Sequence, residues 1–403
     1  MSEDRIPLSN LNCYLATKSL FVGTKDNVCQ CCIQGSVATA PNWNDVDDLN
    51  TWFKDHNTFN EIRSDLNKGI QSKHCQRCWN YENNGLPSNR NYANELGAGY
   101  SLDPEIEHLD IRMSNKCNLR CRMCNAGASS LIEDTVNQML SEGVSNNSYL
   151  SKQYDSTNTT NINKLIKLIA ECKTLKSIEF AGGEPFIMPE VEYILSQLVE
   201  QKRTNVRISL ITNVTSTKNR IFELLKKFSN VSITCSIDGV DKYLEYQRYP
   251  VKWKTVERNF LQMYNEKGEN IEFTILPSIS QLTLLGLDKF FEYFKKFNVK
   301  IGFNQVIDPS YLDFRLIPLD HRNEFLDKVP NIDYSFLNGH LYNSYKHFFE
   351  KSVYEHRDIT DKERILLRDA VKFWNYKSSI KYEELYPWAN ELLTNNGKPC
   401  IIN

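Results

Sequence analysis

The feature that most constrains the fold is an alternation of strand-like and helix-like segments that begins near residue 107. Apolar runs typical of strands cover residues 107–113, 177–183, 205–213, 231–238, 270–280 and 299–307. Helical patterns cover residues 188–202, 216–228, 252–267 and 284–297. Strands joined by helical crossovers predict an α/β fold with a parallel sheet, either open or closed toward a barrel. In such folds ligands bind at the carboxyl ends of the strands.

The chain also contains 12 cysteines, most of which are clustered. The first cluster consists of Cys13, Cys29, Cys31, Cys32, Cys75 and Cys78, and the second of Cys117, Cys121 and Cys124. In a reducing compartment, cysteines at such density are expected to be metal ligands or reactive thiols rather than disulfides.

Charge is nearly balanced, with 48 Lys and Arg against 50 Asp and Glu. No broad basic face follows from this balance, so we expect no nucleic-acid partner. The first residues show no signal-peptide pattern, and no apolar run is long enough for a spanning helix. We therefore expect a cytoplasmic protein without a membrane partner.

Three regions are predicted from these patterns. Residues 1–100 form a small Cys-rich domain, residues 101–308 the alternating domain, and residues 309–403 a mostly helical tail that packs on that domain or lines a substrate site. A polar stretch at 141–164 reads as a surface insertion. In the tail, Thr360 and Glu363 form a capping-box pattern at a helix start.

The second cysteine cluster has the spacing C-x3-C-x2-C and directly follows the first predicted strand. Three thiolates can hold a [4Fe–4S] cluster and leave one iron open to another ligand. Zinc, completed by a distant His or Cys, is the alternative. The second strand ends in Gly182, Gly183, Glu184 and Pro185. The glycines allow a ligand to approach the backbone closely, although the same residues could form a simple helix-entry turn.

Together these motifs resemble the radical S-adenosylmethionine (SAM) enzymes over residues 105–307. The resemblance implies a partial (β/α)6 TIM-type barrel. It implies that Cys117, Cys121 and Cys124 hold the cluster, that SAM binds its fourth iron, and that Gly182, Gly183 and Glu184 contact the amino end of SAM. The residue before the third cysteine is usually aromatic in this family and lines the adenine. Here it is Met123, which is soft and apolar enough to pack there.

Later strand ends supply further candidate SAM contacts. Ser236 in "SIDG" and Arg248 resemble the ribose- and carboxylate-contacting pair of peptide-modifying radical SAM enzymes, although a turn residue and a surface charge are the simpler interpretations. Asn213 is a candidate for the ribose, and Val306 for the adenine.

Cys13, Cys31, Cys75 and Cys78 follow the spacing C-x17-C-x43-C-x2-C. Residues 20–32 read as a hairpin with Lys25, Asp26 and Asn27 at its turn, and residues 58–85 as a helix, a loop and the cysteine pair. This resembles the twitch module, the short relative of the SPASM domain, which binds an auxiliary [4Fe–4S] cluster. That module commonly follows the barrel, whereas here it precedes it. A zinc ribbon is the competing interpretation, and the roles of Cys29 and Cys32 stay open.

The resulting hypothesis is a radical SAM oxidoreductase or modifying enzyme. It cleaves SAM to a 5′-deoxyadenosyl radical, abstracts hydrogen from a peptide, protein side chain or small molecule, and passes an electron to the auxiliary cluster. A reductant such as flavodoxin or ferredoxin is implied. No catalytic acid or base is assigned. The alternative is a non-catalytic zinc- or iron–sulfur-binding protein on a degenerate barrel.

Overall fold

The computed structural model describes residues 11–23, 28–34, 43–83, 88–97, 99–144, 162–217, 220–302, 304–306, 308–326 and 355–394. The chain divides into two compact units. Unit 1 comprises Met1–Ser114, Asp155–Leu210 and Arg220–Val231, and unit 2 comprises Asn115–Tyr154, Ile211–Asn219 and Ser232–Asn403. We describe each unit separately.

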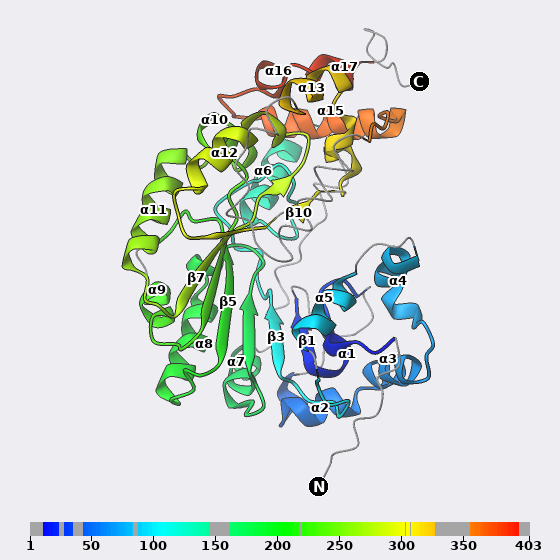
Figure 1. The fold of residues 1–403 in the computed structure, drawn as a ribbon, viewed down its shortest axis with the longest axis vertical. Coiled ribbons are helices and arrows are strands. Elements are labelled where there is room, and N and C mark those ends of the chain that lie inside the picture. The colour runs from blue at the N-terminus through cyan, green and yellow to red at the C-terminus, as the bar shows by residue number, and fades with distance from the viewer. Residues whose placement is uncertain are drawn as a thin grey trace. The chain divides into compact units, whose positions relative to one another are not determined.

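Within the described residues, the main sheet has eight strands in the order β2-β1-β3-β4-β5-β6-β7-β9 (Figure 1). Their bounds are β1 Ser19–Val22, β2 Val28–Cys29, β3 His108–Ile111, β4 Ser177–Phe180, β5 Arg207–Thr212, β6 Val231–Cys235, β7 Ile271–Ile275 and β9 Lys300–Ile301. The pairs β1–β3, β3–β4, β4–β5 and β7–β9 are parallel, and β1–β2 is antiparallel. The predicted α/β class with a mostly parallel sheet is confirmed.

In unit 1 the inner strands alternate between buried apolar and more accessible polar side chains. On β4, Ile178 and Phe180 are buried, whereas Ser177 and Glu179 are partly exposed. A strand with this alternation packs one face on helices and leaves the other face for polar groups. The remaining barrel helices of unit 1 are α7 Ile162–Glu171, α8 Pro189–Glu200 and α9 Arg220–Leu225, with the short helix η3 Pro185–Ile187.

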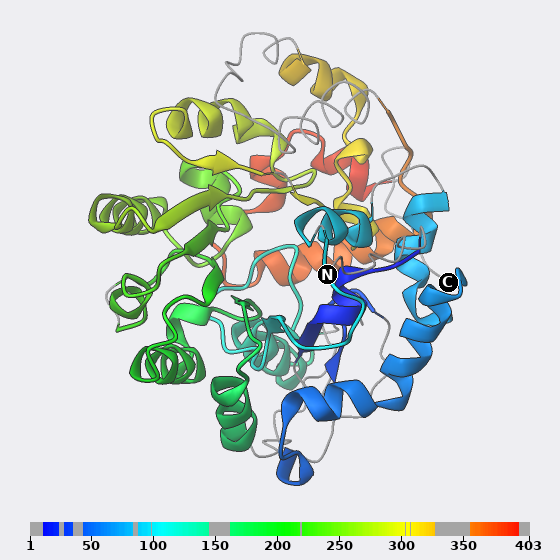
Figure 2. The same cartoon turned by 60° about the horizontal axis from the view of Figure 1, so that its bottom comes forward.

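The N-terminal part of unit 1 contributes a strand to this sheet. β1 pairs with β3 in parallel from Ser19↔His108 to Val22↔Ile111, and the two strands run side by side (Figure 1 and Figure 2). β1 and β2 form the predicted hairpin, whose turn residues Lys25, Asp26 and Asn27 lie outside the described residues. The surrounding helices are α1 Tyr14–Lys18, η1 Trp43–Asp45, α2 Leu49–Asp55, α3 Asn57–Asn67, η2 Lys73–Cys75, α4 Gln76–Asn83 and α5 Asn89–Leu96. The domain boundary near residue 100 stays a prediction. The sequence did not predict that β1 pairs with β3 in the main sheet.

In unit 2 the last two predicted strands are each broken once, which corrects the prediction of continuous strands. β7 is followed by β8 Ser278–Ile279, and β9 by β10 Asn304–Gln305, and β8 and β10 pair in a separate two-stranded sheet. Pro277 has no N–H to donate, so it interrupts the ladder. Backbone bonds from Gly302 N to Ile275 O and from Val306 N to Ile279 O, at 2.9 and 2.8 Å, continue the pairing on both sides of the break.

The other elements of unit 2 are helical. They are α6 Ser130–Ser141, α10 Asp241–Gln247, α11 Trp253–Glu266, η4 Leu284–Gly286, α12 Leu287–Phe294, η5 Ser310–Leu312, η6 Phe314–Leu316, α13 Leu319–Leu326, α15 Asp361–Asn375, α16 Tyr382–Leu385 and α17 Ala389–Leu393. The predicted capping box is confirmed, because both of its bonds, to Thr360 Oγ1 and to the Glu363 carboxylate, are present. Most of the predicted insertion, residues 145–161, lies outside the described residues.

Within unit 2, the C-terminal tail packs onto the segment at Gln281 and Leu282 through buried aromatic side chains. Tyr382 Oη and Trp388 Nε1 both donate to Gln281 Oε1, at 2.6 and 3.2 Å, and Tyr386 Oη donates to Leu282 O at 2.8 Å. Each polar tip of these rings therefore has a buried partner, as aromatic core residues require.

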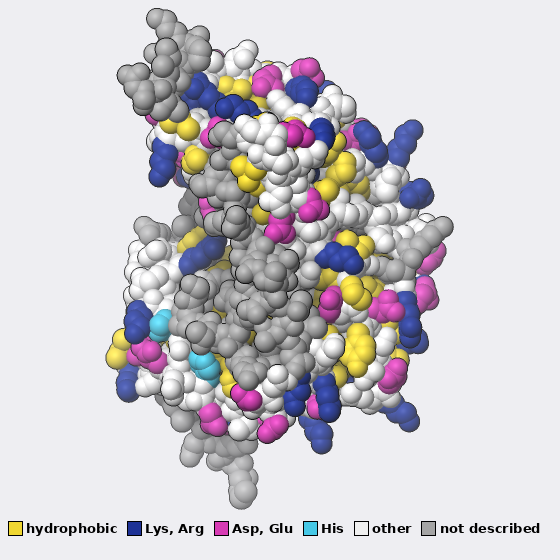
Figure 3. Space-filling view, turned by 180° about the vertical axis from the view of Figure 1, so that it is seen from behind, with side chains coloured by type: hydrophobic (Ala, Val, Ile, Leu, Met, Phe, Trp, Pro, Cys, Tyr) yellow, Lys and Arg dark blue, Asp and Glu magenta, His cyan; other side chains and the backbone are white. Residues whose placement is uncertain are grey.

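Across the described surface in Figure 3, Lys and Arg side chains are interspersed with Asp and Glu, in keeping with the balanced composition. A search of the described helices for one that is both long and apolar enough to span a bilayer finds none.

Candidate functional site

The C-x3-C-x2-C loop of unit 2 connects β3 to α6 and is fixed through its own backbone. Arg120 N donates to Tyr249 O at 2.8 Å, and Arg122 N donates to Gln247 O at 2.9 Å. These two bonds anchor the loop to the end of α10. Cys117, Cys121 and Cys124 are all reduced and partly buried.

Two side chains of unit 2 donate to the sulfur atoms of this loop. Asn213 Nδ2 lies 3.9 Å from Cys117 Sγ, and Arg248 Nη1 lies 3.8 Å from Cys121 Sγ. Arg248 is itself held by Asp238, with Nε 2.6 Å from Oδ2 and Nη2 2.9 Å from Oδ1. Asp238 is fully buried and also accepts from Ser278 N at 2.8 Å. Hydrogen bonds to sulfur stabilise thiolate ligands, so this donor set fits a thiolate-ligated cluster.

Burial favours the protonated thiol at two of these cysteines. Burial raises the pKa of Cys121, an effect that Arg248 opposes. Burial likewise raises the pKa of Cys124 to about 11. Because only thiolates bind metal, loading this site must release protons.

The Gly-Gly-Glu motif belongs to unit 1, at the carboxyl end of β4. Gly182 has a φ of +100°, and a Cβ there would lie 3.2 Å from both Arg112 Cβ and Ser114 O. Gly183 N donates to Ser114 O at 3.2 Å. Glu184 is fully buried, and its Oε1 accepts from Phe186 N at 3.1 Å at the start of η3. The backbone here follows a path that only glycine adopts without strain.

We expect Gly182→Ala to destabilise unit 1 by about 1–3 kcal/mol, because the positive φ and the close contacts penalise a Cβ. Thermal or urea unfolding of the metal-free protein measures this cost. Gly239→Ala is the control, since its Cβ would meet Tyr243 Cβ at an ordinary 3.5 Å. Equal stability of the two variants would contradict the expectation.

The remaining predicted SAM contacts all belong to unit 2. Met123 and Ser236 are partly exposed, and Ser236 N donates to Thr212 O at 2.8 Å. Val306 is 7% exposed and continues the β8–β10 pairing. Their roles toward SAM stay predictions.

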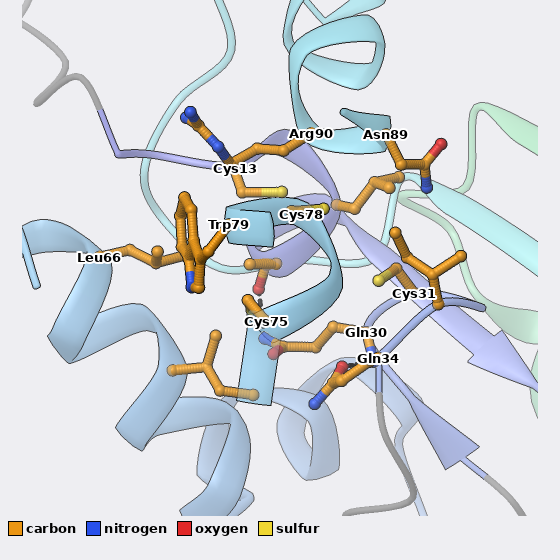
Figure 4. Close-up of a pocket in the computed structure, with 14 residues that line it drawn as sticks. Cys13, Gln30, Cys31, Gln34, Leu66, Cys75, Cys78, Trp79, Asn89 and Arg90 are labelled. Atoms are coloured by element: carbon orange, nitrogen blue, oxygen red, sulfur yellow. Dashed lines mark hydrogen bonds between the residues drawn. The ribbon is translucent and has the colours of Figure 1, made fainter. Parts of the chain in front are cut away.

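The four predicted auxiliary ligands surround one cavity within unit 1. Cys13 precedes α1, Cys31 follows β2, and Cys75 and Cys78 lie on η2 and α4. All four line a cavity of about 460 Å³, open solvent at its mouth included, together with Ile62, Leu66 and Trp79. In Figure 4 the sulfur atoms of Cys13, Cys31 and Cys78 point into the space between these residues.

Burial, the neighbouring cysteines and Arg90 all affect the pKa values of the thiols at this cavity. Burial raises the pKa of Cys13 to about 11 and that of Cys75 to about 12, and the cysteines also act on one another. The Arg90 guanidinium lies beside Cys13 and Cys78 and is held by Glu82, with Nε 3.0 Å from Oε1. A buried cation beside several thiols suits a site whose ligands become anionic.

Cys29 and Cys32 do not line this cavity. Cys29 is fully buried, and its Sγ donates to Cys31 O at 3.4 Å, whereas Cys32 is exposed. Of Cys29, Cys31 and Cys32, it is therefore Cys31 that lines the cavity together with Cys13, Cys75 and Cys78. Within the described residues, no three His, Cys, Asp or Glu side chains are grouped so as to hold a single metal ion.

Sequence reasoning missed the partner of Arg248 and the burial of Arg122. The sequence does show that arginines lie between the cysteines of the loop. Because charged residues are rarely buried, however, their position did not predict that Arg122 is buried. Asp238 lies beyond the end of β6 at Cys235, so strand alternation says nothing about its side chain.

A cysteine triplet in the loop after β3, with side-chain donors to two of its sulfurs, is typical of a cofactor-binding protein of the parallel α/β class. Residues 111–278 match the model of the radical SAM superfamily. The match covers 168 of the 403 residues, and over this region the chain is similar to radical SAM proteins.

Two curated relatives are similar over part of the chain. "Uncharacterized protein MJ0907" of Methanocaldococcus jannaschii is 25% identical over 229 residues, which is 56% of this chain and 71% of that protein. "Radical SAM cyclopropyl synthase TigE" of Paramaledivibacter caminithermalis is 24% identical over 261 residues, 63% of this chain and 52% of that protein. This chain thus spans only about half the length of TigE.

Among solved structures, Streptococcus suis SuiB bound to S-adenosylmethionine matches with a TM-score of 0.38 and 14% identity, over 70% of this chain and 59% of SuiB. The methyltransferase TsrM of Kitasatospora setae, with cobalamin and a [4Fe–4S] cluster bound, matches with a TM-score of 0.29 and 10% identity, over 36% of this chain and 30% of TsrM. Both scores are too low to carry an argument about function.

The match to the superfamily supports a [4Fe–4S] cluster and SAM as cofactors. The predicted radical SAM identity and the α/β architecture are confirmed. The auxiliary cluster, the roles of individual residues and the substrate stay predictions.

Proposed function

We propose that this chain is a radical SAM modifying enzyme that oxidises or cross-links a carbon centre of a peptide, protein side chain or small molecule. An auxiliary [4Fe–4S] cluster at Cys13, Cys31, Cys75 and Cys78 would accept the electron released at the end of the reaction. The observation that carries the proposal is that these four cysteines line one cavity, although Cys13 and Cys78 are 65 positions apart in the sequence.

In this proposal Cys117, Cys121 and Cys124 hold the SAM-binding cluster. When bound, the cluster and SAM supply a one-electron cleavage that yields methionine and a 5′-deoxyadenosyl radical. The protein's own groups keep the ligand sulfurs in place: Asn213 and Arg248 donate to them, and Asp238 orients Arg248. Gly182 gives the turn after β4 its positive φ and its close approach to Arg112 and Ser114.

The auxiliary site bears on the type of reaction. Four protein ligands leave no iron open, so such a cluster suits electron transfer rather than substrate binding. Removing both a hydrogen atom and an electron from the substrate is a net oxidation. The name of the relative TigE, a cyclopropyl synthase, describes bond formation at carbon, which falls within the proposed class.

The test is anaerobic reconstitution with iron and sulfide, followed by SAM and dithionite. We expect a brown protein with about eight irons per chain, in two clusters of four, that forms 5′-deoxyadenosine. Deuterated candidate peptides and small molecules should then pass deuterium to 5′-deoxyadenosine when the correct substrate is present. A colourless protein that carries zinc and leaves SAM intact would instead support a non-catalytic metal-binding protein.

A further inference from the structure

Arg122 is a buried cation inside the cysteine loop of unit 2. It lies between Cys121 and Met123 and is only 1% exposed. Within the described chain its Nε, Nη1 and Nη2 atoms all lack a hydrogen-bond partner. Buried guanidinium groups normally have such partners, so three orphaned nitrogens on one side chain require an explanation.

The surroundings of Arg122 do not neutralise its charge. Its guanidinium carbon lies 4.6 Å from the ring centroid of Tyr246 and 5.5 Å from that of Tyr249. Such stacking compensates part of the loss of hydration, but not all of it. Burial lowers the pKa of Arg122. The other groups with the largest effects on this pKa are Tyr246, Arg120, Tyr386 and Cys121, and none of them is a carboxylate.

We propose that Arg122 is the counter-ion of the cluster held by Cys117, Cys121 and Cys124, and that it raises the reduction potential of this cluster. The inference rests on the proposed cluster at these three residues. A [4Fe–4S] cluster with three thiolates is anionic when oxidised and gains another negative charge on reduction. A buried cation on the residue that follows Cys121 in the loop therefore stabilises the reduced form more than the oxidised form.

The other arginines near the loop are placed differently. The charge of Arg248 is paired with Asp238 at 2.6 Å. Arg120 donates to Tyr376 O and stacks 4.4 Å from the ring centroid of Tyr249 and 5.5 Å from that of Phe373. The groups that shift the pKa of Arg120 most include no cysteine, whereas Cys121 is among the groups that shift the pKa of Arg122. Arg120 is thus a matched control of the same residue type, two positions away.

The experiment is a redox titration of the reconstituted full-length protein, followed by electron paramagnetic resonance. The cluster at the cysteine loop is identified as the signal that changes when SAM is added. Arg122→Met should lower the ratio of reduced to oxidised cluster at a fixed potential about tenfold, equivalent to ~59 mV for one electron. Arg122→Lys keeps the charge and should stay within about twofold of wild type. Arg120→Met should shift the ratio less than Arg122→Met.

The possible outcomes separate the two proposals. A wild-type potential in Arg122→Met, an equal shift in Arg122→Lys, or an equal shift in Arg120→Met would each overturn the role of Arg122. Wild-type protein without any SAM-responsive signal would overturn the proposed function itself. If Arg122→Met does not bind iron, Arg122→Gln, which is neutral but polar, is titrated instead and judged by the same criteria.

Discussion

Replacement of Cys117, Cys121 and Cys124 by alanine is expected to abolish SAM cleavage and to remove about four irons per chain. No other described residue of this loop offers a thiolate, so no site remains for the SAM-binding cluster. The measurements are iron content after anaerobic reconstitution and 5′-deoxyadenosine formed with dithionite.

Cys235→Ala is the matched control for this experiment. Cys235 is fully buried on β6, and its replacement removes a thiol from the same unit without touching the loop. We expect it to retain both the irons and SAM cleavage. Formation of 5′-deoxyadenosine by the triple variant would show that the loop does not hold the catalytic cluster.

The second large effect concerns the cavity of unit 1. Cys75→Ala combined with Cys78→Ala should remove about four irons per chain while leaving the SAM-responsive cluster and basal SAM cleavage intact. Turnover to the final product should be lost, because the electron would have no acceptor. Iron content, the paramagnetic resonance signal with and without SAM, and product formation measure these effects separately.

Cys172→Ala serves as the control here, since Cys172 is a buried cysteine of unit 1 that does not line the cavity. Loss of zinc rather than iron from the double variant would identify a zinc site. An unchanged metal content would show that Cys75 and Cys78 are not ligands.

Much of the fold could be predicted because periodicity records which face of a strand or helix is buried. The segments around Ile178 and Phe180 alternate as expected for a half-buried strand, and α8 buries Val191, Ile194, Leu195 and Leu198 at helical spacing. The breaks in the last strands were missed, although Pro277 was visible in the sequence, because the apolar run continues past it. β1 was not assigned to the main sheet, since a four-residue strand shows nothing of its distant partner.

The candidate site was predictable to the extent that its chemistry is local in sequence. Cys117, Cys121 and Cys124 are close together, so their spacing indicated a metal site, and the neighbouring Gly-Gly-Glu motif favoured a cluster over zinc. The pairing of Arg248 with Asp238 and the donation by Asn213 to Cys117 depend on how distant segments pack, and spacing does not contain that information. For the N-terminal cysteines, spacing already favoured Cys31 over Cys29 and Cys32, and Cys31 is the one of these three that lines the cavity.

The parallel pairing of β1 with β3 has a practical consequence for dissecting this protein. A chain cut near residue 100 would lose the neighbour of β3 along four register positions. The backbone amides and carbonyls on that side of β3 would then be exposed, which invites association between molecules. The cysteine-rich segment therefore also protects one edge of β3. Fragments of this protein should keep Ser19–Val22.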